Sequence, residues 1–296
     1  MIKKYLTLML ILPLIMSGCN QKDDWADLQQ EVQQMMEEAD GDFALAFKDL
    51  ETGYVMEYNA TEEFHAASTM KTPVMIEVYK QAAAGAFSFA DSVLIKNEFK
   101  SIVDGSPYSL SVTDDSEGEL YNMLGKKRTI ADLTYDMIIV SSNLATNLVI
   151  ELVDAKNVNQ TMRDLGAKDI NVLRGVEDIK AFEQGLSNTT TAHDLQLIFE
   201  KIAAGEVVNK ESSDDMIDIL LDQRFNDIIP AYLPERVKVA HKTGSITGVH
   251  HDSGIVFLPD GRKYVLVLLS KNLPDFDKGT ELLARVSEKI YQHMTQ

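Results

Sequence analysis

The first residues that could do chemistry together are Ser68-Thr69-Met70-Lys71, at the start of a segment with helical spacing. Residues three apart on a helix share a face, so the Ser68 hydroxyl and the Lys71 amine can meet. Serine is a weak nucleophile until a base accepts its proton, and a lysine held away from water can be that base. A helix N-terminus would add N–H groups and a positive potential for an oxyanion. The alternative is a capping serine beside an exposed lysine.

Two further polar motifs follow in the chain. Ser141-Ser142-Asn143 lies between two segments with helical periodicity, and its alternative is an inter-helix turn in which Asn143 caps the second helix. His241-Lys242-Thr243-Gly244-Ser245 ends a β-rich run, and its alternative is an edge strand protected by a lysine. Each motif alone is weak, but the three in this order are difficult to explain by chance.

In their order the three motifs resemble those of the penicillin-recognising serine enzymes, and specifically the class A β-lactamase family. The resemblance covers most of residues 25–295 and extends to Phe64-His65-Ala66-Ala67, Leu144-Ala145-Thr146-Asn147 and Thr189-Thr190-Thr191. It implies a serine hydrolase that opens β-lactam rings through a Ser68 acyl-enzyme, which water then hydrolyses.

The resemblance also implies a role for each matching residue. Ser68 corresponds to the acylated nucleophile, Lys71 to its proton-relaying partner, and Ser141 to the hydroxyl that gives a proton to the leaving nitrogen. The implied substrate-binding residues are Asn143, Lys242, Thr243, Gly244 and Ser245. Among these, Lys242 would also act on Ser141, and the N–H groups of Ser68 and Ser245 would form the oxyanion hole.

Two motifs depart from the family pattern. The middle motif has Ser142 where the family has aspartate, and this side chain is expected to point inward at little cost. In the Ω-loop, the family places the deacylating glutamate two residues after an arginine and an asparagine four residues further on. Here Glu177 comes one residue late after Arg174, and Ala181 stands at the asparagine position. Glu177 is the candidate general base, and the alternative is a loop carboxylate paired with Arg174.

The position of Glu177 leaves the function open at one point. Fast hydrolysis needs a base that delivers water to the acyl-enzyme, whereas acylation needs only the three motifs. A D-Ala-D-Ala carboxypeptidase or slow penicillin-binding protein therefore remains an alternative. An alternative of another class is a non-catalytic envelope binding or sensor module.

His250-His251-Asp252 could be mistaken for a metal cluster. Consecutive strand residues point to opposite faces, so at most two of the three side chains could meet one ion. We therefore expect no metal, and no cofactor. His250 or His251 is instead a candidate contact for the substrate carboxylate.

The periodicity of the chain predicts the elements that position these residues. Apolar spacing predicts helices over 25–39, 69–84, 129–140, 144–153, 189–204 and 278–293. β-Rich runs predict strands over 42–48, 54–58, 237–240, 253–258 and 263–270, and the polar stretch 97–127 reads as loop and short helix. This order indicates an α+β, β-lactamase/transpeptidase-like fold: an antiparallel sheet flanked by N- and C-terminal helices, with an inserted all-helical domain. The expected limits are 25–66 plus 206–296 for the sheet domain and 67–205 for the helical domain.

The first residues resemble an export signal. Residues 1–18 have two lysines, an apolar stretch and then small residues, and the stretch is too short for a spanning helix. Ser17-Gly18-Cys19 resembles a bacterial lipobox, in which the cysteine becomes the lipidated N-terminus. We expect a lipoprotein signal peptide over 1–18, a tether over 19–24, and a lipid-anchored protein of the cell envelope, at the outer membrane or cell surface.

Composition restricts the partners. The 296 residues are 45% hydrophobic, which is ordinary for a globular protein. The 28 lysines and arginines against 46 aspartates and glutamates give a net charge of −18, which repels nucleic acid. With one cysteine there is no intramolecular disulfide. We expect a monomer that takes a small-molecule β-lactam, binds no nucleic acid, and meets the membrane only through its lipid.

Overall fold

The computed structural model describes the backbone of residues 20–296 and the side chains from Trp25 onward. Cys19 and the signal sequence expected over 1–18 lie outside the described residues. No helix within the described part of the chain is both long and apolar enough to span a bilayer.

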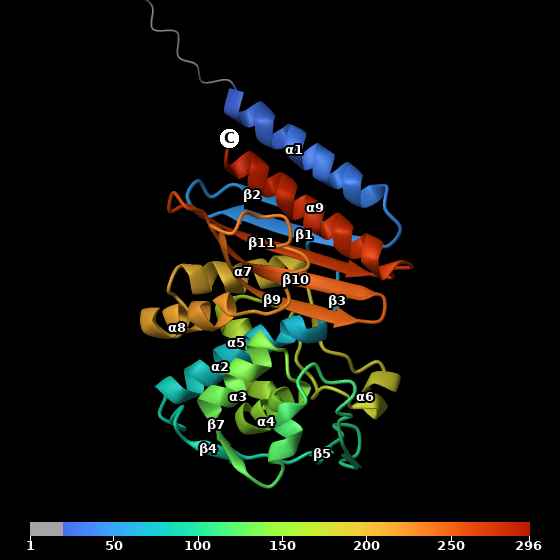
Figure 1. The fold of residues 1–296 in the computed structure, drawn as a ribbon, viewed down its shortest axis with the longest axis vertical. Helices are drawn as coiled ribbons and strands as arrows, with labels where there is room; N and C mark the ends of the chain where they lie inside the picture. The colour runs from blue at the N-terminus through green and yellow to red at the C-terminus, as the bar shows by residue number, and fades with distance from the viewer. Residues whose placement is uncertain (1–19) are drawn as a thin grey trace, which may run out of the picture.

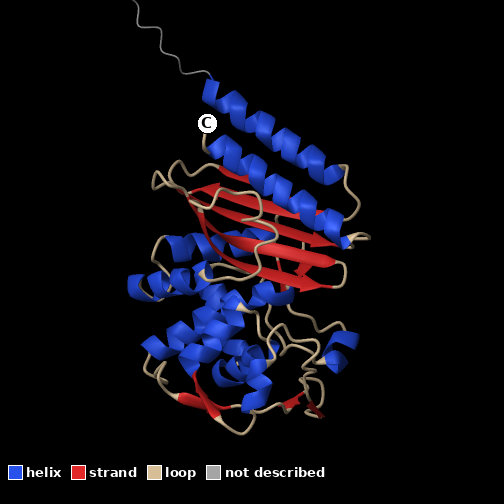
Figure 2. Ribbon diagram, viewed as in Figure 1, coloured by secondary structure: helices blue, strands red, loops and turns tan. Residues whose placement is uncertain are grey.

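An antiparallel five-stranded sheet forms the centre of the molecule (Figures 1 and 2). Its strands lie in the order β2-β1-β11-β10-β9, and every neighbouring pair is antiparallel. Their bounds are Asp42–Asp49 for β1, Val55–Tyr58 for β2, Lys238–Ile246 for β9, Val249–Phe257 for β10 and Lys263–Lys271 for β11. The motif with Lys242 therefore lies on an edge strand.

Side chains on alternate residues of β1 enter two different cores. Phe43, Leu45 and Phe47 face the terminal helices α1 (Asn20–Glu37) and α9 (Phe276–Met294), which lie side by side over one face of the sheet (Figure 1). Ala44 and Ala46 point to the opposite face, where their small side chains let helices approach closely. The alternation confirms the expected sheet flanked by N- and C-terminal helices.

The opposite face of the sheet is covered by two helices that come late in the chain. These are α7 (Ala192–Ala203), which contacts β1, β10 and β11, and α8 (Lys210–Leu221), which contacts β9. Thr191 caps α7 by accepting from the N–H of Asp194 at 3.1 Å, as the threonine-rich sequence predicts.

The helical part lies beyond these two helices (Figure 2). Its helices are η1 (Ala67–Met70), α2 (Lys71–Ala83), η2 (Glu119–Met123), α3 (Ile130–Ile139), α4 (Asn143–Val153), α5 (Ala155–Leu165) and α6 (Ile179–Glu183). Three pairs of short strands complete it: β3 (Phe64–His65) with β8 (Thr189–Thr190), β4 (Ser92–Leu94) with β7 (Lys127–Thr129), and β5 (Phe99–Lys100) with β6 (Pro107–Tyr108). One continuous apolar core joins this part to the sheet, through residues such as Met70, Leu144 and Ala240.

The structure corrects several predicted bounds. Helix α1 begins at Asn20, inside the tether expected over 19–24, and the tether itself stays a prediction. Helices α5, α6 and α8 have no counterpart among the predicted elements. The helix predicted over 189–204 begins only at Ala192, because Thr189 and Thr190 form strand β8. Strands β9 and β10 run further than their apolar runs. The extra residues of β9 include the polar ones of the lysine motif, and those of β10 include His250, His251 and Asp252; hydrophobic patterning does not register such polar strand residues. The domain limits stay a prediction.

Phe47 offers a test of the core between the sheet and the terminal helices. Its fully buried ring lies 5.4 Å from that of Trp25 and 5.5 Å from that of Tyr264. We expect Phe47→Ala to lower the free energy of unfolding by about 3–5 kcal/mol, because it leaves a cavity. Guanidinium denaturation measures this, with Val55→Ala on the exposed side of β2 as the control. A Phe47→Ala protein as stable as this control would contradict the assignment of Phe47 to the core.

Candidate active site

Ser68 lies in the short helix η1, directly before α2. The residue before it, Ala67, has a φ of +44°, and its N–H donates to His65 Nδ1 at 3.0 Å. A positive φ at a non-glycine residue persists only where the surroundings hold it. Ser68 is half-buried and lines a cleft of about 670 Å³, together with Asn143, Glu177 and Ser245. The structure thus places four of the predicted site residues around one cleft.

Lys71 is completely buried and contacts the middle motif. Its Nζ donates to the carbonyl oxygen of Ser141 at 2.7 Å, to Ser141 Oγ at 3.0 Å and to Asn143 Oδ1 at 3.1 Å. Ser141 has a φ of +56°, another left-handed value. The alternative of an exposed lysine is therefore wrong.

Lys242 reaches the same hydroxyl from the sheet. Its Nζ donates to Ser141 Oγ at 3.1 Å and to the carbonyl oxygen of Thr243 at 3.0 Å, and its side chain is completely buried. The alternative of a protective edge lysine is wrong, although β9 is an edge strand. Ser141 Oγ thus lies between two amines.

Burial of the two amines shifts their titration. Desolvation lowers the pKa of Lys71 to about 7, against an opposing influence of the Asp115 and Glu177 carboxylates. Desolvation and the charge of Lys71 hold the pKa of Lys242 well below its usual value, while Asp252 opposes this. Neutral lysine is therefore accessible near neutral pH, and a hydroxyl between two such amines can pass a proton.

Glu177 lies in the cleft and is held by two donors. The N–H of Ser111 donates to its Oε2 at 3.0 Å, and Asn143 Nδ2 lies 3.4 Å from its Oε1. Burial raises the pKa of the Glu177 carboxyl, and these two donors oppose that rise. Arg174 donates instead to the carbonyl oxygens of Leu186 (3.0 Å) and Gly175 (3.1 Å). The alternative of an Arg174–Glu177 ion pair is wrong.

The end of β9 lies directly against the nucleophile. A Cβ atom on Gly244 would stand 3.0 Å from the N of Ser68 and 3.1 Å from the N of Thr69, so a side chain here would require the backbone of η1 to shift by a few tenths of an ångström. Of the two neighbouring residues predicted to bind substrate, Ser245 is exposed and lines the cleft. Thr243 is buried, with 6% of its surface exposed, and is not among the residues that line the cleft.

The expectation for His250 and His251 is wrong. His251 is fully buried; its Nδ1 accepts from the N–H of Ser270 at 3.1 Å, so its Nε2 donates to the carbonyl oxygen of His65 at 2.9 Å. His250 Nδ1 pairs with Thr280 Oγ1 at 2.7 Å. Neither histidine lines the cleft. In the described part of the chain, no group of three histidine, cysteine or acidic side chains is arranged to hold a metal.

Three residues of the site were not predicted from the sequence. Asn147 holds the Ω-loop, because its side chain accepts from the N–H of Val176 at 2.6 Å and donates to the carbonyl oxygen of Val176 at 3.0 Å. Ser111 holds Glu177, as described above. The carboxylate of Asp115 accepts from the N–H groups of Asn143 and Leu144, both at 2.9 Å. The motif Leu144-Ala145-Thr146-Asn147 could have indicated the first, but no short-range pattern indicates the other two.

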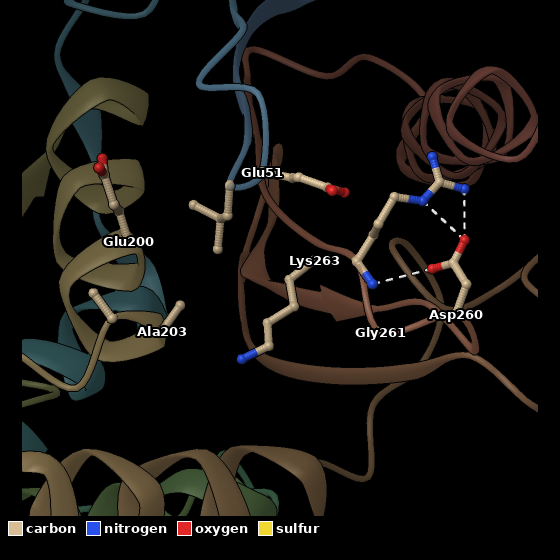
Figure 3. Close-up of a pocket in the computed structure, with 9 residues that line it drawn as sticks. Glu51, Glu200, Ala203, Asp260, Gly261 and Lys263 are labelled. Atoms are coloured by element: carbon tan, nitrogen blue, oxygen red, sulfur yellow. Dashed lines mark hydrogen bonds and ion pairs between the residues drawn. The ribbon is translucent and has the colours of Figure 1, made fainter.

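A second hollow of about 580 Å³ lies between α7 and the turn before β11 (Figure 3). Two of its charged side chains pair with each other, Arg262 with Asp260 at 2.7 Å, and a third, Glu200, pairs with Lys48 outside the hollow. None of the predicted site residues lines it. The hollow therefore offers no nucleophile and no proton relay.

Comparison with known proteins agrees with this geometry. A family model described as the beta-lactamase enzyme family matches residues 27–294, and the chain belongs to that family. It is 27% identical to beta-lactamase ROB-1 of Haemophilus influenzae over 253 residues, which covers 84% of this chain and 78% of that protein. It is 26% identical to a beta-lactamase of Bacteroides uniformis, over 70% of this chain and 76% of that one.

One solved structure is informative about the choice of function. The structure of the protein PBP-A superposes with a TM-score of 0.78 at 27% identity, and the match covers 91% of this chain and 96% of that one. A mutant of PBP-A, also with a TM-score of 0.78, was solved as an acyl-enzyme complex with penicillin G. The chain thus resembles proteins named as β-lactamases and a protein that penicillin acylates.

Gly244 offers a test of the contact between β9 and η1. We expect Gly244→Ala to slow labelling of Ser68 by a fluorescent penicillin about tenfold or more, because the added methyl group displaces the nucleophile's backbone. The control is Gly118→Ala, where the nearest atom to a new Cβ lies 3.7 Å away. Equal labelling rates for the two variants would show that the close approach has no role.

Proposed function

We propose that the protein is a serine hydrolase of the class A β-lactamase type, which opens β-lactam rings through a Ser68 acyl-enzyme. The observation that carries the proposal is the position of Ser141 Oγ, at 3.0 Å from the amine of Lys71 and 3.1 Å from that of Lys242. This relay borders the cleft that contains Ser68. The substrate is a small-molecule β-lactam, and the reaction needs no cofactor.

In acylation, neutral Lys71 accepts the proton of Ser68 as the oxygen attacks the β-lactam carbonyl. The carbon–nitrogen bond then breaks, and the nitrogen takes the proton of Ser141. Ser141 regains a proton from the amine of Lys71, which returns that lysine to its neutral form. The N–H groups of Ser68 and Ser245 receive the negative charge on the carbonyl oxygen. Because Lys71 must be neutral, acylation is expected to slow as the pH falls below the lysine's pKa of about 7.

In deacylation, Glu177 accepts a proton from water, which attacks the ester carbonyl and releases Ser68. A carboxyl group with a raised pKa is a stronger base than an exposed one, which suits this step. Glu177 lies in the same cleft as Ser68, in spite of its late position in the Ω-loop sequence.

The second candidate is a D-Ala-D-Ala carboxypeptidase or slow penicillin-binding protein. Two observations favour it. Both oxygens of Glu177 face donors of the protein, Ser111 and Asn143, which compete with water. The similarity to PBP-A is as close as that to the β-lactamases reported above. A non-catalytic envelope binding or sensor module is disfavoured, because the buried lysines would have no use in it.

Glu177 decides between these functions. We expect the unaltered protein, mixed with a chromogenic cephalosporin, to form product with only a transient adduct. We expect Glu177→Gln to accumulate the acyl-enzyme, with a fall in turnover of about a hundredfold or more, because the general base is lost. Time-resolved mass spectrometry measures the adduct, with Ser68→Ala as the blank and Glu183→Gln, on the exposed side of α6, as the matched control.

The outcomes of this experiment distinguish the β-lactamase from the two alternative functions. A persistent adduct in the unaltered protein would favour the penicillin-binding protein or peptidase. The absence of any adduct on Ser68 would contradict both enzyme readings for β-lactams and would favour the binding module.

We also propose that the protein is exported and lipid-anchored to the cell envelope as a monomer. The lipobox-like Ser17-Gly18-Cys19 supports the anchor. Mass spectrometry of the N-terminal peptide from an expressing bacterium tests it. A lipid-modified Cys19 as the first residue is expected, and Cys19→Ala should remove the modification. A mature chain that begins elsewhere, without lipid, would contradict the proposal.

A further inference from the structure

The segment Ser111–Glu117 lies against the turn that carries Ser141. Ser116 Oγ donates to the carbonyl oxygen of Val140 at 2.6 Å and lies 3.3 Å from that of Ser141. At its other end, the N–H of Ser111 donates to Glu177. A stretch of a few residues therefore contacts both the proton relay and the candidate deacylation base.

Asp115 makes the central contact of this segment. Its Oδ1 accepts from the N–H of Asn143 and its Oδ2 from that of Leu144, each at 2.9 Å. Tyr121 also donates its hydroxyl to Oδ2, at 3.0 Å. The two N–H groups belong to the first turn of α4, where a helix has no internal acceptors and a carboxylate is favoured. These bonds fix the start of α4 to a segment 28 residues earlier in the chain.

The local cap of α4 does not replace Asp115. The cap residue is Ser142, whose Oγ accepts from the N–H of Ala145 at 3.2 Å. It therefore serves a different donor and carries no charge. The alternative in which Asn143 is the cap is therefore wrong, and among the described side chains Asp115 is the acceptor for the N–H of Asn143.

The position of Asn143 matters because its side chain bridges the two halves of the reaction. Its Oδ1 accepts from Lys71 Nζ, and its Nδ2 faces Glu177. The charge of Asp115 also acts on Lys71, since it favours the ammonium form against burial. Lys71 faces the Glu177 carboxylate and the Lys242 amine as well, and these stay constant when only Asp115 changes.

We propose that Asp115 is a positioning residue for acylation: its carboxylate holds the Ser141–Leu144 turn against Lys71 and sets the charge that Lys71 experiences. The inference rests on the proposed acylation of Ser68. It assigns a function to Asp115, which lies in the stretch 97–127 that the sequence predicts only as loop and short helix.

Asp115→Asn removes the charge with little change of shape and tests the inference. The readout is the single-turnover rate of Ser68 acylation by a fluorescent penicillin between pH 5 and 9, in the full chain from residue 20. We expect a rate at least about tenfold lower on the plateau, because asparagine has one acceptor oxygen: one of the two hydrogen bonds from backbone N–H groups is lost and the other loses its charge assistance. We also expect the fall of the acylation rate at low pH (the low-pH limb) to occur at a lower pH than in the unaltered protein. The reason is that Lys71 loses its proton more readily without the neighbouring negative charge.

The matched control is Glu119→Gln, which removes one charge from the same run at an exposed side chain. It should leave both the rate and the limb unchanged. If Asp115→Asn does not fold, as judged by thermal unfolding, Asp115→Ser provides the same test with one acceptor and no charge.

The results distinguish the inference from the function on which it rests. No labelling of the unaltered protein would mean that the proposed function fails. Normal labelling of the unaltered protein, together with an unchanged rate or an unchanged limb in the Asp115 variant, would overturn the inference. An unchanged limb would leave Asp115 as a helix cap without influence on Lys71.

Discussion

Two buried lysine amines around one hydroxyl are the constraint on which the rest of the structure depends. Removing an ammonium group from water is costly, so Lys71 and Lys242 cannot both remain charged without compensation. The fold compensates in part with carbonyl and amide oxygens around Lys71 and with the carboxylates of Asp115, Glu177 and Asp252 at longer range. The part of the desolvation cost that these groups do not offset lowers the pKa of both lysines. The same desolvation that opposes folding therefore produces a base near neutral pH.

Keeping three chain segments in register around that hydroxyl requires local backbone strain. Ala67, Ser141 and Glu177 all have positive φ values without being glycine; Ala67 and Glu177 line the cleft, and Ser141 stands two residues before Asn143, which also lines it. Such conformations cost of the order of 1–3 kcal/mol each, so they must be imposed by the packing around them. This packing consists of the continuous core from the helical part to β9, together with the close approach of β9 to η1 at Gly244. Rigid elements thus hold these residues in left-handed backbone conformations, and these conformations determine the directions in which the side chains of Ser141 and Glu177 point.

What the sequence could predict was limited by how far apart the interacting residues lie along the chain. Ser68 and Lys71 share one helical turn, and the three motifs could be found by type and order. Asp115 could not be found, because it acts through backbone N–H groups of a distant turn, and backbone donors have no sequence signature. The prediction that His250 or His251 contacts the substrate was wrong because closeness in sequence to the lysine motif does not place a side chain in the cleft. The side chain of His250 bonds to Thr280, and that of His251 bonds to the backbone of His65 and Ser270. The helical bounds shifted where capping side chains, rather than apolar spacing, determine the ends.

The difference between hydrolysis and a lasting acyl-enzyme rests on very few atoms. The proposed acylation uses Lys71 and Lys242, which both bond Ser141, whereas the proposed deacylation depends on one carboxylate, that of Glu177, on a loop with a left-handed backbone. Asn147 fixes Val176, the residue before Glu177, and Ser111 and Asn143 fix the carboxylate itself. Because the Glu177 carboxylate cannot turn freely, it can accept a proton only from a water molecule that lies in the direction in which these contacts hold it. In the proposed mechanism the orientation of Glu177 therefore separates hydrolysis of a β-lactam from a lasting acyl-enzyme, and the Ser111–Glu117 segment contacts both Glu177 and the turn that carries Ser141.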